Sequence, residues 1–485
     1  MNVRQLLQRL GALCGAAALA LLFACTGAPT TPSTAATVAA RGERGRELED
    51  LERRTFQFFW DTANPANGLV PDRFPSPSFA SVAAVGFALS AYPIGVERGY
   101  VSRAQARERV LRTLRFLRDA PQGPGADGFA GYKGFFYHFL NMGDGLRWSH
   151  GVELSTIDTA LLMAGALACA DYFDGREPGE GEIRRIADEL YRRVDWAWAA
   201  NAAGGVALGW TPEKGYHPMR WHGYNEAMIL YLLGLGSPTF PLPDGAWREW
   251  TSTYDPAWRT EYGQTYLTFP PLFGHQFSHV WVDFRALQDD FMRGKGIDYF
   301  ENSRRATYAQ QAYAIANPMH WTGYGATLFG LSASDGPVGI AIPDGTGLRV
   351  FRQYAARGMG GAATYDDGTL SPAALVSSVV FAPEIVLPAV AELNRRYGRY
   401  VYSTYGFLDA LDPSFDYDVP LHAGSRIPGV GWVDGDYIGI DQGSTIGMIE
   451  NYRSGLLWRI MRRDPYLRRG LERAGFAGGW LGERP

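Results

Sequence analysis

Two kinds of helical pattern alternate along the chain. Segments that are apolar on almost every side are typical of fully buried helices, and segments with charged and apolar stripes are typical of helices with one face in solvent. The first kind comprises residues 81–95, 155–173 and 224–236. The second kind comprises residues 47–63, 102–120, 181–200 and 303–317, and residues 371–398 are apolar and then charged. This alternation predicts two concentric layers of helices, which is an all-α, two-layer α/α toroid.

Strand signals are few, and long loops rich in Gly, Pro and aromatic residues join the expected helices. Residues 338–343 (VGIAIP) and 437–443 (YIGIDQG) are predicted to form short strands within these loops. In a toroid, the N-termini of the inner helices and the loops before them gather around one central cleft. We therefore expect a functional site at the starts of the buried helices.

The N-terminal segment has the pattern of an export signal. Arg4 and Arg9 precede an apolar run over residues 10–24, which is short for a membrane span. Cys25 follows this run directly, as at a bacterial lipoprotein cleavage site, where it becomes the lipidated first residue. Phe23 is unusual in such a site, so cleavage of a plain secretory signal is the alternative.

The interpretation of the N-terminus as an export signal divides the chain into three parts. Residues 1–25 form a lipoprotein-type signal, and residues 26–45, rich in Thr, Ala, Pro and Gly, form a flexible tether. Residues 46–485 form a single domain. We therefore expect an exported protein, held in the periplasm or at the outer membrane by its lipid.

Composition excludes some partners. The 485 residues are 46% hydrophobic, enough for a sizeable core, and the net charge of −4 offers no basic surface for nucleic acid. Aromatic residues make up 14% of the chain, which is explained either by a large core or by a cleft lined with rings that stack on sugars. Cys169 lies in an apolar segment and is predicted to be a small buried residue without a nucleophilic role.

Acidic residues stand at or near the starts of expected inner helices: Glu153 and Asp158, Glu226, and Asp441 with Glu450. Each has an ordinary structural explanation. Ser155 and Asp158 have the spacing of a capping box. An acid after Asn225, a good N-cap, is favoured by the helix dipole by roughly 0.3–1 kcal/mol. Glu450 is one turn from Arg453 and is suited to an ion pair.

The aromatic surroundings of these acids favour a catalytic role. Trp148 and His150 precede one pair, and Trp221, His222 and Tyr224 crowd around Glu226. Burial among rings raises the pKa of a carboxyl group, as a general acid near neutral pH requires. Glycoside hydrolysis needs two carboxyl groups, one to protonate the leaving oxygen and one to activate water or attack. Acids from separate inner helices meet this need.

The sequence gives little support for a metal or a cofactor. His275 and His279 lie four residues apart in HQFSH, but the internal Glu of a zinc-protease motif is missing, as is a third ligand at fixed spacing. No phosphate-binding loop and no GxSxG nucleophile motif occur in the sequence. We expect no metal and no cofactor.

Five long motifs resemble the glycoamylase-like bacterial proteins that include the β-1,2-glucanases of glycoside hydrolase family 144. They are ELSTIDTALLMAG, WHGYNEAMILYLLGLGS, FGHQFSHVWVDFR, NPMHWTGYGATLFGLSASDGP and GIDQGSTIGMIENYRSGLLW, and the likeness runs from about residue 50 to 480. The resemblance implies an (α/α)6 barrel, a central sugar cleft and hydrolysis of β-1,2-linked glucose chains with inversion.

The resemblance also implies roles for residues. Glu226 is the expected general acid, and Glu153, Asp158, Asp441 and Glu450 are expected in the cleft. Asp158 is the first choice for the base and Glu450 the second. The expected aromatic platforms and polar contacts for sugar are Trp148, Trp221, Tyr224, Trp281, Trp321, His222 and His279. Each of these aromatic residues has a place in the core as its alternative explanation.

The sequence thus predicts a glycoside hydrolase that acts on β-1,2-glucan or a close relative. Two alternatives remain at this stage: a polysaccharide lyase or epimerase on the same type of toroid, and a non-catalytic glycan-binding lipoprotein. Fold alone does not separate them. We expect an oligo- or polysaccharide partner, membrane contact only through the lipid, and a monomer.

Overall fold

The structure, a computed structural model, describes residues 34–343, 347–360 and 364–482, and the chain divides after Glu47 into two compact units. Helix α1 (Thr34–Thr62) crosses this division, so residues 34–45 of the expected tether are helical. The expected signal and Cys25 lie outside the described residues. Among the helices of the described part, none combines the length and apolar character needed to span a bilayer.

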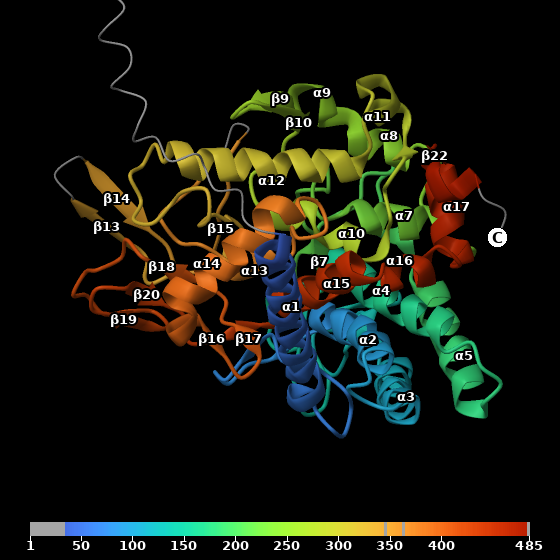
Figure 1. Cartoon of the computed structure of the whole chain (residues 1–485). Helices are drawn as coiled ribbons and strands as arrows, with labels where there is room; N and C mark the ends of the chain where they lie inside the picture. Colours follow the sequence, from blue (N-terminus) through green and yellow to red (C-terminus); the bar gives the residue numbers. More distant parts are fainter. Residues whose placement is uncertain (1–33, 344–346, 361–363, 483–485) are drawn as a thin grey trace, which may run out of the picture. The chain divides into compact units, whose positions relative to one another are not determined.

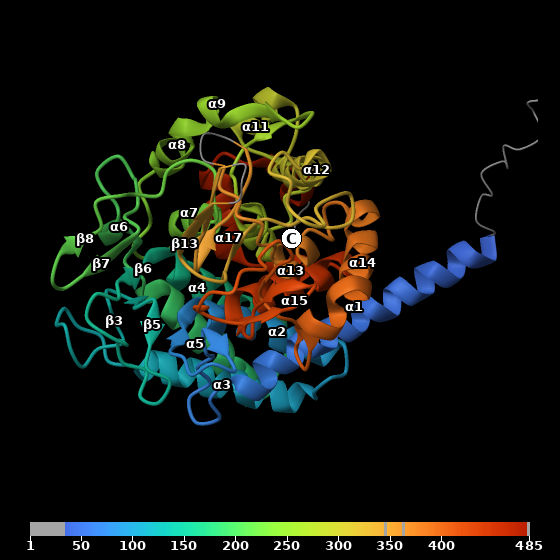
Figure 2. The same ribbon diagram turned by 90° about the vertical axis from the view of Figure 1, so that its left-hand side faces the viewer.

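An inner layer of helices forms the core of the second unit, Leu48–Pro485 (Figure 1). It consists of α2 (Val82–Glu97), α4 (Thr156–Tyr172), α7 (Met228–Gly236), α10 (Phe277–Trp281), α13 (Pro372–Val376) and α15 (Gly439–Arg453). Helix α2 packs against α4 on one side and against α15 on the other, which closes the ring. The central position of α4, α7, α13 and α15 is visible in Figure 2.

Close packing within this layer depends on glycine. A Cβ atom on Gly165 of α4 would lie 2.0 Å from the carbonyl oxygen of Gly86 of α2, so only glycine lets the two helices approach this closely. Residues 82–95 of α2 are all buried, as are residues 156–169 of α4. The prediction that these segments are buried on every side is confirmed.

Outer helices cover this layer. They include the part of α1 from Leu48 onward, α3 (Arg103–Asp119), α5 (Pro178–Arg193), α12 (Tyr299–Ala316), α14 (Pro383–Val401) and α17 (Pro465–Arg473). Helix α5 packs on α3 and α4, α14 packs on α13, and α17 packs on α7. The all-α toroid predicted from the sequence is confirmed.

Shorter helices connect the layers: α6 (Trp196–Ala199), α8 (Ala246–Trp250), α9 (Tyr254–Ala257), α11 (Asp290–Lys295), α16 (Leu456–Met461), η2 (Thr251–Thr253), η3 (Leu272–His275) and η4 (Gly479–Gly482).

The strands are short and pair antiparallel within the loops. Those before α10 are β1 (Arg73–Phe74), β2 (Ala80–Ser81), β3 (Gly131–Tyr132), β4 (Phe135–Phe136), β5 (Phe139–Leu140), β6 (Leu154–Ser155), β7 (Gly209–Thr211), β8 (Gly215–Tyr216), β9 (Trp258–Glu261) and β10 (Gln264–Leu267). Those after it are β11 (Leu287–Gln288), β12 (Ala333–Ser334), β13 (Ile340–Pro343), β14 (Leu348–Phe351), β15 (Ala355–Ala356), β16 (Tyr402–Ser403), β17 (Gly406–Phe407), β18 (Leu411–Asp412), β19 (Ser425–Ile427), β20 (Gly431–Val433), β21 (Tyr437–Ile438) and β22 (Ala477–Gly478).

Several strands lead directly into inner helices and so fix where those helices begin. Strand β6 precedes α4 and joins β7 and β8 in a three-stranded sheet, with Leu154 opposite Trp210 and Trp210 opposite Tyr216. Strand β21 precedes α15 and pairs with β1. The loops therefore hold the starts of α4 and α15 in place.

Besides shifts of a few residues at the ends of other elements, three segments differ from the prediction. The helix expected over 181–200 ends at Arg193, and Asp195 caps the separate short helix α6 by accepting a hydrogen bond from the Trp198 N–H. The segment 371–398 contains two helices, α13 and α14, because the second begins afresh at Pro383. Residues 437–443 are a strand only at Tyr437–Ile438, and the rest is the first turn of α15.

Candidate active site

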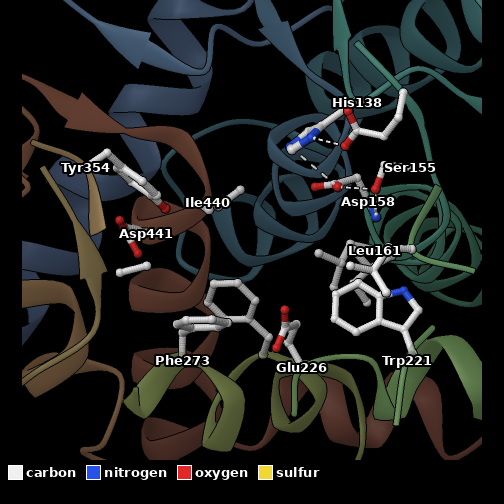
Figure 3. Close-up of a pocket in the computed structure, with 15 residues that line it drawn as sticks. His138, Ser155, Asp158, Leu161, Trp221, Glu226, Phe273, Tyr354, Ile440 and Asp441 are labelled. Carbon is white, nitrogen blue, oxygen red and sulfur yellow. Dashed lines mark hydrogen bonds and ion pairs between the residues drawn. The ribbon is translucent and has the colours of Figure 1, made fainter. Parts of the chain in front are cut away.

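A cavity of about 290 Å³ lies at the starts of α4, α7 and α15 (Figure 3). Its polar lining comes from separate elements: Asp158 from α4, Asp441 from α15, Glu226 from the turn before α7, and Glu153 and His138 from loop segments. Its apolar lining includes Trp221, Phe273, Phe277 and Ile440. The structure thus brings together Glu153, Asp158, Trp221, Glu226 and Asp441, as the sequence predicts.

Asp158 is fixed at the first turn of α4. Ser155 is the N-cap of this helix, and its hydroxyl accepts a hydrogen bond of 3.2 Å from the Asp158 N–H. The same hydroxyl donates to the Asp158 carboxylate. The expected capping role of Ser155 is confirmed, and it coexists with the place of Asp158 in the cavity wall.

His138 links Asp158 to Glu153. Its Nδ1 lies 2.9 Å from Oε1 of Glu153, and its Nε2 lies 3.5 Å from Oδ2 of Asp158. Burial alone would lower the pKa of His138, but the two carboxylates raise it to about 9. Burial raises the pKa of Glu153, and the hydrogen bond and charge of His138 outweigh this and lower it. One wall of the cavity therefore holds a cation between two acids.

Glu226 stands in the turn just before α7. The helix begins at Met228, and its N-cap is Ala227, which offers no side-chain cap, so the expectation that Asn225 is the N-cap is wrong. Asn225 instead accepts a hydrogen bond of 2.9 Å from the Ala227 N–H. The Ser278 hydroxyl accepts from the Ile229 N–H at 3.1 Å and so takes the place of a cap.

The carboxyl group of Glu226 is suited to carry a proton near neutral pH. Burial raises its pKa to about 7, a bond from its own backbone N–H opposes this, and the negative charge of Asp158 adds to the rise. Oxygen Oε2 of Glu226 is buried and accepts no hydrogen bond. Trp221, beside it in the cavity wall, is fixed by a 3.0 Å hydrogen bond from its indole N–H to Thr156.

Asp441 lies across the cavity from Asp158, near Tyr354 (Figure 3). Burial raises the pKa of Asp441, a hydrogen bond with Asp409 opposes the rise, and the charges of Asp72 and Asp335 add to it. No cation pairs with Asp441 among the described residues, so its negative charge is not compensated by an ion pair.

Behind Asp441 lies the one group that could hold a metal ion in the part of the chain that the structure describes. Asp335, Asp409 and Asp434 are buried, and each offers an oxygen within 4.8 Å of the others. Arg73 already donates a 2.6 Å hydrogen bond to Asp335. Burial raises the pKa of Asp409 and of Asp434, so protonation of these carboxyl groups also reduces the negative charge of the cluster. The geometry alone therefore does not require a cation.

Glu450 does not reach the cavity, which corrects the prediction that it lies in the cleft as a second choice for the base. It is nine residues beyond Asp441 on α15, about 13 Å along the helix axis. The Arg98 guanidinium donates a 2.7 Å hydrogen bond to it, so the expected pair with Arg453 is also wrong. Arg453 pairs with Glu52 instead.

Four other predicted contacts for sugar lie in the core and do not line the cavity. Tyr224 stacks on Tyr299 with ring centres 5.8 Å apart, and the indole N–H of Trp281 donates to Ser90. Trp321 is 3% exposed and lies under the Arg349 guanidinium. His279 is buried beside Ser303, and burial lowers its pKa to about 3. The core explanation applies to all four, because their rings are buried in the packed interior.

Two further predicted contacts are exposed but outside the cavity wall. Trp148 is 47% exposed and packs against Phe79. His222 points toward Glu249, with 3.8 Å between Nδ1 and Oε1. His275, the other histidine of HQFSH, lies 3.1 Å from the Phe269 carbonyl oxygen through Nε2. The pair His275 and His279 thus serves the packing of η3 and α10.

The cavity wall also contains residues that the sequence did not predict for the site, among them one histidine and three aromatic residues. His138 lies in the run GFFYHFL, where its neighbours suggest only a buried segment, and Tyr354 lies in a loop without a pattern. Phe273 and Phe277 flank the histidines that drew attention to HQFSH. The polar His138 within an apolar run was the one signal that the sequence offered.

Comparison with known proteins finds relatives that agree with the resemblance seen in the sequence motifs. A curated protein of Parabacteroides distasonis, described as an exo β-1,2-glucooligosaccharide sophorohydrolase (non-reducing end), is 26% identical over 461 residues. The match covers 88% of this chain but only 57% of that protein. An endo-β-1,2-glucanase from Chitinophaga pinensis, solved with sophorotriose and glucose, is 27% identical with a TM-score of 0.76, over 90% of this chain and 99% of that one.

A further solved structure, a "putative glucoamylase" from Bacteroides uniformis, is 29% identical with a TM-score of 0.76, and it covers 90% of this chain and 99% of that one. The family model described as "Putative glucoamylase" matches residues 218–465, which is just over half of the chain. The resemblance found in the sequence motifs is thereby confirmed, and the chain belongs to this glycoamylase family.

Proposed function

We propose that the protein is a glycoside hydrolase that cleaves β-1,2-linked glucose chains in the cavity at the starts of α4, α7 and α15. The observation that carries this proposal is the placement of Glu226, a carboxyl group with a pKa of about 7, among three further carboxylates and a tryptophan. The linkage is taken from the Chitinophaga and Parabacteroides relatives, which are described as acting on β-1,2-glucans or their oligosaccharides.

Glu226 acts as the general acid in this proposal. Its protonated form donates to the oxygen of the leaving sugar, and its unpaired Oε2 leaves room for this contact. Burial at the start of α7 weakens the stabilisation of the ionised form by water, so the proton is held near neutral pH until the leaving oxygen takes it.

For the base, we propose Asp441 in place of Asp158, the choice made from the sequence. Oxygen Oδ2 of Asp158 is engaged both by the Ser155 hydroxyl and by Nε2 of His138. Asp441 has no cationic partner among the described residues, and its pKa is raised, which makes it the stronger base. Asp158 then supplies a fixed negative charge that raises the pKa of Glu226. Attack by an activated water inverts the configuration of the sugar.

The charge of the cavity disfavours the lyase and epimerase alternative. Glu153, Asp158, Glu226 and Asp441 line it, and His138 is the one basic side chain in its described lining. An acidic sugar would be repelled by this arrangement, whereas a neutral glucan is not. The glycan-binding alternative has no use for a carboxyl group held near pKa 7.

The test is an assay of end products. The protein without residues 1–25 is incubated with linear β-1,2-glucan and, in parallel, with other β-glucans, while reducing ends and product sizes are followed. We expect short β-1,2-oligosaccharides from β-1,2-glucan alone, with the α configuration at the new reducing end by NMR. Products that absorb in the ultraviolet would show a lyase, and no product from any glucan would refute the proposal.

Three variants connect this activity to the cavity. Glu226→Gln and Asp441→Asn should each lower kcat by roughly 10²–10⁴, the usual contribution of general acid–base catalysis. Asp158→Asn should lower it less, because it changes a charge near the acid and leaves the acid and the base in place. If Asp158→Asn abolished activity and Asp441→Asn did not, the two roles would have to be exchanged.

We also propose that the protein is exported and anchored as a monomer by a lipid on Cys25. The support is the sequence pattern alone: Arg4 and Arg9, the apolar run over residues 10–24, and the cysteine that follows it. Labelling of cells with an alkyne fatty acid should mark the wild type and not Cys25→Ser. Equal labelling of both would refute the anchor, and release of an unlabelled mature form would support plain signal cleavage.

A further inference from the structure

A second cavity of about 440 Å³ adjoins the proposed catalytic cavity. Glu153 and Leu208 line both, so the two spaces meet at these side chains. The remaining lining of the second cavity comes from residues 209–218, which contain strands β7 and β8, and from Gly151. Its volume is within the roughly 300–1,000 Å³ that is usual for small-molecule sites.

The aromatic wall of this second cavity is held rigidly. The ring centre of Trp210 lies 5.6 Å from that of Trp198 and 5.5 Å from that of Tyr132. The Tyr216 hydroxyl donates a 2.5 Å hydrogen bond to the Trp198 carbonyl oxygen. Fixed rings lose little conformational entropy when a ligand stacks on them, which favours binding of the flat apolar face of a sugar.

An ion pair fixes the hairpin that carries these rings. The Arg147 guanidinium donates to both carboxylate oxygens of Glu213, at 2.7 and 3.0 Å, between β7 and β8. The side chain of Arg147 is 2% exposed, so the pair ties the hairpin to the body of the domain. The shape of the second cavity is therefore preformed.

Polar groups suited to sugar hydroxyls surround the rings. The exposed ammonium of Lys214 has no partner among the described residues, and the Nδ1 of His217 is used by the Met219 N–H, which leaves its Nε2 available. Glu153 stands at the junction, close against Gly209, where a Cβ atom would lie 2.6 Å from its Cγ. Glycine at 209 thus lets this acceptor lie between the two cavities.

We propose that the second cavity binds glucose residues of the same β-1,2-glucan chain that continue past the site of cleavage, with Trp210 as the stacking platform. This inference rests on the proposed function and extends it: the enzyme selects long chains over short ones. The continuity of the two cavities at Glu153 and Leu208 is what identifies the occupant as one continuous neutral chain.

The experiment compares kcat/KM on β-1,2-gluco-oligosaccharides of defined length. For the wild type, kcat/KM should rise with length beyond the shortest oligosaccharide that is hydrolysed. In Trp210→Ala, kcat/KM on the longest substrates should fall about tenfold, while kcat/KM on the shortest should change less than twofold. Lys214→Ala, on the exposed hairpin, should also lower kcat/KM more on long substrates than on short ones. It should have no effect on folding.

The matched control is Trp258→Ala. Trp258 is a partly buried ring that packs against Phe291 and lines neither cavity. It should leave the dependence on length as in the wild type. The inference would be overturned if kcat/KM of the wild type did not depend on substrate length. It would also be overturned if Trp210→Ala and Lys214→Ala lost kcat/KM equally on short and long substrates. Either result would leave the hydrolase proposal standing. No hydrolysis by the wild type would overturn both.

Discussion

The Ser278 hydroxyl donates a 3.1 Å hydrogen bond to the backbone carbonyl of Glu226. It also accepts one from the Ile229 N–H, so a serine of α10 fixes the turn from which the proposed acid projects. Both bonds join α7 to its neighbour in the inner layer. The position of Glu226 is therefore set by tertiary contact, because Ala227 at the N-cap provides no local cap.

Ser278→Ala should loosen this turn. We expect a loss of about 1–2 kcal/mol in the free energy of unfolding and a fall in kcat of about tenfold, because the carboxyl group is no longer held in one position. Denaturant unfolding and steady-state kinetics measure the two. Ser90→Ala is the matched control, since Ser90 is buried and also makes two hydrogen bonds. A loss of stability with unchanged kcat in Ser278→Ala would refute the positioning role.

The pKa of Glu226 predicts a dependence of stability on pH. Its pKa in the folded protein, about 7, is above the value of 4.5 for an exposed Glu, so the folded state binds the extra proton between these values. Stability should therefore fall as pH rises from 4.5 to 7. Glu226→Gln, which mimics the protonated form, should be more stable than the wild type at pH 8 and equal to it at pH 4. Identical pH profiles of unfolding for both proteins would contradict this.

His138 should lower stability in the same direction, with rising pH, but over a higher pH range. Its pKa of about 9 exceeds the ordinary 6.5, so its ion pairs stabilise the fold fully below pH 6.5 and are lost as pH rises through 9. His138→Gln should lower the melting temperature at pH 6 and much less at pH 9.5, and it should lower kcat/KM because Glu153 and Asp158 lose their shared cation. His422→Gln, at an exposed position, is the control. An equal loss of stability at both pH values would rule out the ion pairs.

Glu450 should matter for stability and not for chemistry. Glu450 is buried and bonded to Arg98, so Glu450→Ala leaves the partly buried Arg98 guanidinium without one of its partners and should cost about 3 kcal/mol of unfolding free energy. The kcat per folded molecule should stay within twofold of the wild type. A large loss of kcat at unchanged stability would return Glu450 to the candidates for a catalytic role.

The layered fold was predictable because burial on every side is visible in a sequence as an apolar run. Helices α2 and α4 show this directly. The break between α5 and α6 was not predictable from the sequence. It depends on Asp195, which caps the short helix α6 and so ends the continuous helix that the apolar pattern favours. The start of α15 was mistaken for a strand because Tyr437 and Ile438 carry strand propensity immediately before it.

The site was predictable where an acid stands at the start of a buried helix, as Asp158, Glu226 and Asp441 do. Sugar contacts were not predictable from aromatic residues near these acids in the sequence, because such residues, for example Tyr224 and Trp281, are equally suited to the core. His138 was missed because its partners Glu153 and Asp158 are 15 and 20 residues away in the sequence, and only the loop before α4 brings them together.

The role of Glu226 as the general acid is tested most directly by the dependence of the rate on the leaving group. Glu226→Gln and the wild type are assayed on β-1,2-glucan and on an aryl β-sophoroside whose phenol leaves without protonation. We predict a loss of roughly 10²–10⁴ in kcat/KM on the glucan and a far smaller loss on the aryl substrate. Equal losses on both substrates, or near wild-type hydrolysis of the glucan by the folded variant, would contradict the assignment.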